Sequence, residues 1–173
     1  GLEKVNPTEL AKGIADALAG VKVDLAQCNE SVSEYLTAQQ AKKFEGNVAE
    51  GKKFLEENKK RPEVKTTNSG LQYEIMKAGA GAKPTANDKV TVHYHGTLLN
   101  GTVFDSSVER GQPATFGVNQ VIPGWVEGLQ LMPLGSKWKF FIPYDLAYGE
   151  RGAGGEIGPF ATLIFEVELL KIN

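Results

Sequence analysis

The first stretch of the chain places apolar residues three and four positions apart, with polar and charged residues between them. Asn6 can cap a helix, and Pro7 suits the first helical position, where no backbone N–H is needed. Gly20 supplies a stop signal. The pattern therefore predicts a short helix, whose apolar positions are Leu10, Ile14, Ala17 and Leu18.

A second series with the same spacing occupies residues 31–61 and ends before Pro62. A helix of about thirty residues would be about 45 Å long, so much of its narrow apolar stripe needs a partner outside its own domain. The alternative is a helix that folds back on the neighbouring domain. Gly51 is tolerable in its interior if another helix crosses closely there. The apolar positions are Val32, Tyr35, Leu36, Ala41, Phe44, Val48, Gly51 and Leu55.

Beyond residue 67, apolar and polar residues alternate, which is the period of a strand with one buried face. Asn100 and Gly101 predict a hairpin turn, and only residues 124–131 leave room for a helix between strands. The sequence therefore predicts an α+β fold with an antiparallel sheet wrapped on one short helix. Expected inward positions include Leu71, Tyr73, Ile75, Val90, Val92, Tyr94, Trp138, Phe140, Ile142 and, in a last strand over 161–171, Ala161, Leu163, Phe165, Val167 and Leu169.

Composition changes at the same point as the periodicity. Residues 1–67 contain 11 basic and 11 acidic side chains but only three of the aromatic residues. The remaining chain contains twelve aromatic residues and fifteen of the 20 glycines. We therefore expect a helical arm over 1–67 and a separate sheet domain over 68–173. The apolar stripe of the long helix, which needs a partner, predicts that this arm is a dimerisation region.

Overall composition excludes several classes of protein. With 41% hydrophobic and 23% charged residues, the 173-residue chain is typical of a globular protein. A net charge of -2 gives no basic excess for nucleic acid or an anionic membrane, and no apolar run is long enough to span a bilayer. Cys28 is the single cysteine, which excludes an intrachain disulfide and fits a reducing compartment. No signal peptide opens the chain, and Gly1 suggests a cut end.

Three familiar chemistries fit the sequence poorly. His93 and His95 share one face of a strand, but no third ligand with a metal-site spacing accompanies them, so we expect no metal and no cofactor. The glycine-rich stretch 149–158 precedes Pro159 and a strand rather than a helix, so it does not predict a phosphate site. With histidine only at positions 93 and 95, a hydrolytic triad is not expected.

Aromatic residues are concentrated at the predicted strand ends and turns. Each of them considered alone would be interpreted as a core residue. They fall in five segments, 92–96, 101–107, 121–125, 147–149 and 161–170. In this order and spacing the segments resemble the FKBP family of peptidyl-prolyl cis/trans isomerases over about residues 68–173. The preceding region, with 51–58 leading to 69–73, resembles the arm of bacterial two-domain members of the macrophage-infectivity-potentiator-like subgroup and their shorter cytoplasmic relatives.

This resemblance implies a substrate pocket and two departures from the family pattern. Ala114 stands where eukaryotic members carry a second phenylalanine, and Ala153 where many carry a histidine. Both changes make the expected rim less aromatic. The implied catalytic residues are Asp105, Tyr148, Tyr94 and Phe165, and the implied substrate-binding residues are Phe104, Arg110, Phe116, Val121, Ile122, Trp125 and Ile157.

The resemblance also implies roles for these groups. Trp125 would receive the proline ring, and the Ile122 N–H and the Tyr148 hydroxyl would face the substrate carbonyls. Asp105 would lie near the rotating bond, where it either orients Tyr148 or disfavours the carbonyl dipole of the planar amide.

The function implied is acceleration of proline-limited folding, with unfolded or proline-containing polypeptides as partners and rapamycin-type macrolides as inhibitors. The alternatives are a chaperone or binding module in which catalysis is secondary, and a structural dimerisation protein with a vestigial pocket. A homodimer through the N-terminal arm is expected. The expected compartment is the cytoplasm, or the periplasm or cell envelope if a leader was removed.

Overall fold

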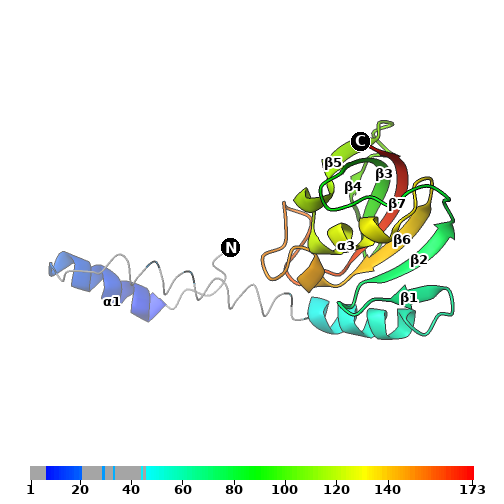
Figure 1. The fold of residues 1–173 in the computed structure, drawn as a ribbon. Coiled ribbons are helices and arrows are strands. Elements are labelled where there is room, and N and C mark those ends of the chain that lie inside the picture. The colour runs from blue at the N-terminus through cyan, green and yellow to red at the C-terminus, as the bar shows by residue number, and fades with distance from the viewer. Residues whose placement is uncertain (1–6, 21–28, 30–32, 34–43, 45) are drawn as a thin grey trace. The chain divides into compact units, whose positions relative to one another are not determined.

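The computed structural model describes residues 7–20, 29, 33, 44 and 46–173 (Figure 1). The chain divides into two compact units, Gly1–Gln40 and Ala41–Asn173. The compositional boundary expected at residue 67 lies inside the second unit. Cys28 and several positions of the long predicted helix, namely Val32, Tyr35, Leu36 and Ala41, lie outside the described residues.

In the first unit, α1 (Pro7–Leu18) forms where the 3.6-residue periodicity predicts it. Pro7 begins the helix, and Gly20 follows it with a φ of 73°, a conformation that favours glycine and ends helices. Ile14 is 55% exposed and Leu18 is 85% exposed. No helix among the described residues is long and apolar enough to cross a membrane.

The second unit contains an antiparallel sheet whose strands lie in the order β1-β2-β6-β7-β3-β4, with β5 paired to β3 (Figure 1). The last strand begins at Leu163 rather than at Ala161 as predicted, and the α+β fold itself is confirmed. The strands are β1 (Val64–Thr66), β2 (Gln72–Lys77), β3 (Lys89–Leu98), β4 (Val103–Ser106), β5 (Ala114–Gly117), β6 (Lys137–Ile142) and β7 (Leu163–Ile172).

One helix, α3 (Pro123–Leu131), packs on one face of this sheet. A Cβ at Gly128 would lie 2.7 Å from the Phe140 ring, and one at Gly124 would lie 2.6 Å from Ile142. The two glycines therefore allow close approach of α3 to β6. Short 3₁₀ turns, η1 (Val118–Gln120) and η2 (Tyr144–Leu146), lie at the entrance to α3 and after β6.

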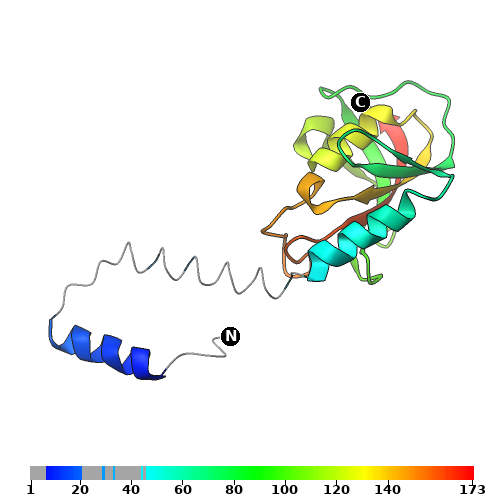
Figure 2. The ribbon, with the colours of Figure 1, turned by 90° about the horizontal axis from the view of Figure 1, so that it is seen from below.

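The opposite face of the sheet is covered by a helix over residues 46–58 (Figure 2). Phe141 points away from the α3 side of β6, is 2% exposed, and lies 5.8 Å from the Phe54 ring. The sequence suggested that another helix crosses close to Gly51. In the structure, Gly51 instead faces the side chain of Thr162. These residues thus fold back on the sheet, which was the alternative to a partner outside the domain.

This helix ends at Asn58, three residues before the predicted end at Arg61. Proline disfavours helical conformation in the residue before it and clashes with the carbonyl four positions earlier, so Pro62 stops the helix at Asn58. The Asn58 amide is buried and donates from Nδ2 to Gln72 Oε1 at 2.9 Å. Gln72 in turn donates to the Leu55 carbonyl at 2.9 Å, which fastens the helix end to β2.

Candidate active site

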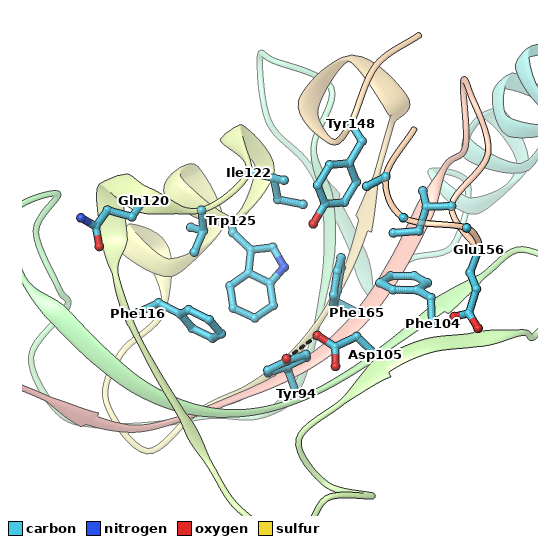
Figure 3. A pocket seen from close by; sticks show the side chains of 15 residues that line it. Tyr94, Phe104, Asp105, Phe116, Gln120, Ile122, Trp125, Tyr148, Glu156 and Phe165 are labelled. Atoms are coloured by element: carbon cyan, nitrogen blue, oxygen red, sulfur yellow. Dashed lines mark hydrogen bonds between the residues drawn. The ribbon is translucent and has the colours of Figure 1, made fainter. Parts of the chain in front are cut away.

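A cavity of about 870 Å³ opens beside the first turn of α3 (Figure 3). Strands β3, β4, β5 and β7 provide its base and sides, and residues 153–157 form part of its wall. Ten of the eleven predicted site residues line it, and the eleventh, Arg110, bonds to two of them. The ten are Tyr94, Phe104, Asp105, Phe116, Val121, Ile122, Trp125, Tyr148, Ile157 and Phe165.

Aromatic rings meeting edge to face form the floor. Trp125 is 4% exposed, and its ring lies 5.2 Å from Phe165 at 80° and 5.5 Å from Tyr94 at 82°. Phe116 approaches the same indole at 5.9 Å and 89°. Edge-to-face contacts of this kind are favourable beyond the area that they bury, so the rings of the floor stabilise one another in this arrangement.

The side wall depends on a glycine in β3. Phe104 packs edge to face on Phe165, with ring centroids 5.3 Å apart. A Cβ at Gly96 would lie 2.7 Å from the Phe165 ring and 2.8 Å from the Phe104 ring. Only glycine therefore lets both rings reach the cavity from neighbouring strands.

A compact polar cluster interrupts the apolar lining. Tyr94 donates from its hydroxyl to Asp105 Oδ2 at 2.5 Å (Figure 3). Arg110 donates to Asp105 Oδ1 through one guanidinium nitrogen and to the Tyr94 hydroxyl at 2.7 Å through the other. The guanidinium also lies 5.6 Å from the centre of the Tyr94 ring, within cation–π range. These contacts fix the Asp105 carboxylate in one position.

The cluster shifts the pKa values of both acidic groups. Burial acts to raise the pKa of Asp105, but the hydrogen bonds from Tyr94 and Arg110 and the Arg110 charge outweigh it and lower this pKa. Burial, followed by the hydrogen bond to Asp105, raises the pKa of Tyr94. At neutral pH, Asp105 is therefore ionised and Tyr94 keeps its proton.

Tyr148 is 41% exposed and extends over the cavity from the other side. Burial and the nearby Asp105 charge raise its pKa, so its hydroxyl remains a donor at neutral pH. The Tyr148 hydroxyl bonds to no residue in the described part of the chain. The option that Asp105 orients Tyr148 by a hydrogen bond is thus not seen, because the Asp105 bonds go to Tyr94 and Arg110.

Several features of the site were not expected from the sequence. Gln120 and the short run 154–156 also line the cavity, and Glu156 brings a second carboxylate to its edge. Gln120 stands two residues before Ile122, but no spacing signal singles it out. Of the two expected rim positions, Ala153 lines the cavity, whereas Ala114 lies on β5 and packs against the core.

The two histidines considered as metal ligands have other partners. His93 Nδ1 lies 3.0 Å from Ser107 Oγ, and His95 Nδ1 lies 2.9 Å from Ser106 Oγ. Among the described residues, no three or more of His, Cys, Asp and Glu gather as a metal site would require.

Comparison with known proteins places this arrangement in one class. A family model described as FKBP-type peptidyl-prolyl cis-trans isomerase matches residues 80–170, and one described as the domain amino-terminal to it matches residues 1–75. The fold and the aromatic cavity thus define a peptidyl-prolyl cis-trans isomerase. The chain belongs to the FKBP-type family, as the sequence resemblance predicted.

Individual relatives match along almost the entire chain. The FKBP-type 22 kDa peptidyl-prolyl cis-trans isomerase of Escherichia coli is 54% identical, covering 99% of this chain and 86% of that protein. The outer membrane protein MIP of Legionella longbeachae is 50% identical, covering 98% of this chain and 76% of that protein. The crystal structure of FkpA from Escherichia coli has a TM-score of 0.77 and 38% identity, covering 98% of this chain and 83% of that one. The isomerase function is confirmed.

Proposed function

We propose that isomerisation of X-Pro bonds takes place in the aromatic cavity, with Trp125 beneath the proline ring. The observation that supports this assignment is one cavity in which edge-to-face rings surround a single fixed carboxylate cluster, that of Asp105, Tyr94 and Arg110. An apolar floor suits a proline ring, and the cluster places a fixed charge beside it.

The chemistry requires no nucleophile. Rotation about an X-Pro bond is slow because it destroys amide resonance, at a barrier of about 18–20 kcal/mol, yet no bond breaks and no proton has to move. The planar amide has greater charge separation than the twisted one and so loses more when water is removed. A dry aromatic box therefore stabilises the transition state relative to the ground state.

Three polar groups act on the twisting amide. The Ile122 N–H precedes α3 and has no partner in the described part of the chain, so it is available to a substrate carbonyl together with the Tyr148 hydroxyl. Asp105, held ionised, disfavours the partial negative charge on the planar amide's oxygen and is less repelled once the amide twists. Of its two candidate roles, the hydrogen bonds of Asp105 favour this one.

Peptide isomerisation kinetics test these roles. Tyr148→Phe removes one neutral hydrogen bond and is expected to lower kcat/KM about two- to tenfold. Asp105→Ala removes a charged partner and is expected to lower it about ten- to a hundredfold. Tyr148→Phe should unfold in urea near the wild-type midpoint, because it removes no core volume. Asp105→Ala should stay folded but unfold at a somewhat lower urea concentration, because it removes the hydrogen bonds of the cluster. A folded Asp105→Ala variant with full activity would refute the assignment.

The clients are unfolded polypeptides whose folding waits for a proline, and rapamycin-type macrolides inhibit by occupying the same cavity. Chaperone activity through the arm is a second candidate function. The exposed Ile14 and Leu18 on α1 favour it, because such side chains bind other apolar surfaces, including a second copy of the arm. A client without proline distinguishes the two, since only chaperone activity would improve its refolding yield.

For the compartment, we propose the periplasm or cell envelope in preference to the cytoplasm. A relative that matches nearly all of the chain is named an outer membrane protein, and none of the relatives described above supports the cytoplasmic location by its name. Fractionation of cells expressing the natural gene, with detection by antibody, tests this proposal.

A further inference from the structure

A second, smaller cavity of about 200 Å³ opens beside the catalytic one. Its walls come from the start of helix 46–58, the hairpin between β3 and β4, and the segment 156–162. Glu156 lines both cavities, so the two meet at this residue. We call the smaller one the side groove, and the residues that define it here are Glu50, Leu98, Leu99, Asn100, Glu156 and Ala161.

Specific contacts hold the walls of the side groove. Asn47 donates from Nδ2 to the Pro159 carbonyl at 2.9 Å, which joins the helix to the segment 156–162. A Cβ at Gly158 would lie 2.8 Å from the Phe44 ring, so Phe44, two residues before the described helix, is in close contact with this segment. On the hairpin side, the Thr102 N–H donates to Asn100 Oδ1 at 3.0 Å. These contacts between the walls keep the groove in this shape.

The lining selects one kind of occupant. Glu50 and Glu156 are its only charged side chains, and neither forms an ion pair with any residue that the structure describes. Leu98, Leu99 and Ala161 supply apolar surface. Lysine and arginine bury an apolar stem while presenting a cation at its end, which matches this combination.

We propose that the side groove binds a lysine or arginine side chain of the client polypeptide whose proline occupies the catalytic cavity. This inference rests on the proposed function, because the proline must be held at the neighbouring cavity. Occupying both sites on one chain makes the second contact intramolecular, which strengthens binding without altering the chemical step. The side groove would therefore give the isomerase a preference among X-Pro sequences through charge.

Peptide substrates with a basic residue placed in turn at each position near the proline test the proposal. Each lysine peptide is compared with its norleucine counterpart, which keeps the stem and removes the cation. In one register, we expect the lysine peptide to show a kcat/KM about three- to fivefold higher, through KM, as an exposed charge pair allows. Equal values in every register would overturn the proposal.

Variants locate the effect. Glu50→Gln should lower the lysine preference, and Glu50→Lys should lower it further, because Glu156 remains as the second carboxylate. Glu57→Gln, the same change at an exposed position on the same helix, should leave the preference intact. The ratio is taken within each variant, so a change at the proline site cancels. A lysine preference that Glu50→Gln leaves undiminished would refute the side groove as its source. If the wild-type protein catalysed the isomerisation of none of these peptides, the proposed function itself would be refuted.

Discussion

At the scale of single residues, the site depends on how one carboxylate is held. Asp105 lies at the cavity with two hydrogen-bonding partners, and its position results from contacts between β3, β4 and the turn that carries Arg110. The apolar rings are fixed by packing, whereas this group is fixed by polar contacts that respond to pH. Lowering the pH therefore protonates Asp105 and weakens the cluster, while the packing of the aromatic floor is unaffected.

The first prediction concerns this titration. Asp105 has a lowered pKa in the folded chain, so the cluster stabilises the fold above the unfolded pKa of about 3.9, and this stabilisation is lost as the pH falls through the folded value. We expect kcat/KM to be level from neutral pH down to about 4 and to fall below it. Asp105→Asn should have lower activity and lack this acid limb. An unchanged acid limb in a folded Asp105→Asn variant, checked by circular dichroism, would contradict the prediction.

The second prediction uses the two alanines that depart from the family pattern. Ala153 lines the cavity, so Ala153→Phe should add a wall contact to a bound rapamycin-type macrolide and tighten binding about tenfold, or about 1.4 kcal/mol. Ala114→Phe is the matched control, because Ala114 lies outside the lining and should give no gain. Calorimetric titration measures the macrolide affinity of both variants. Equal gains in affinity would contradict the placement of Ala153, and not Ala114, in the cavity wall.

At the scale of elements, the helix over 46–58 belongs to the isomerase unit. It buries Phe141 on the outer face of β6, and its end is fastened through the buried pair Asn58 and Gln72. The glycine at position 51 is a steric requirement, because a Cβ there would lie 2.3 Å from Thr162 Oγ1. Thr162 is itself buried and β-branched, so its side chain has little freedom to turn away.

The third prediction follows from this contact. Gly51→Ala should destabilise the protein by about 1–3 kcal/mol despite the better helix propensity of alanine. Adding Thr162→Ala should recover part of the loss, because the remaining Cβ would be 3.4 Å away. Gly46→Ala, in the same helix with nothing within 4 Å, should instead stabilise by up to about 1 kcal/mol. Urea unfolding measures the free energy of unfolding of each variant. If Gly51→Ala raised this free energy, the close contact with Thr162 would be refuted.

The sequence predicted the elements better than their partners. Alternation placed Trp138, Phe140 and Ile142 on the core side of β6, and the structure agrees. The same alternation put Phe141 among lysines on the outer face, and only the helix lying over it explains an aromatic residue there. Periodicity predicts which residues are buried but not what buries them, so the role of Gly51 could not be derived.

The site was predictable only as far as the family pattern reached. The rings and the three polar groups follow from residues that match known motifs, whereas Gln120 and Glu156 reach the cavity through loops that carry no periodic signal. The hydrogen bonds among Tyr94, Asp105 and Arg110 join different segments, so their geometry depends on strand register. Sequence spacing alone does not specify such contacts.

At the scale of the whole molecule, we expect the two units Gly1–Gln40 and Ala41–Asn173 to have separate tasks. The first unit presents exposed apolar side chains on α1, and the second contains the cavity. Two cavities joined by a dimeric arm would hold an unfolded client at two points and raise apparent affinity, with little effect on turnover of a short peptide.

The fourth prediction tests this division with two truncations. The full chain should be a dimer by light scattering, and residues 41–173 should be a monomer with nearly unchanged kcat/KM on a short peptide. Residues 68–173 should be less stable, since loss of the helix uncovers Phe141, whose burial contributes about 1.5–3 kcal/mol. A monomeric full chain, or a dimer of residues 41–173, would contradict the role of the arm.

The contacts of the helix start also have a mechanical consequence. Among the residues of this unit that the structure describes, those nearest its N-terminal side are in contact with the segment that follows Ile157 in the cavity wall: Phe44 approaches Gly158, and Asn47 bonds to Pro159. The fastening to β2 at Asn58 comes last. Tension applied to the chain from its N-terminal side would therefore reach the cavity wall before it reaches the sheet.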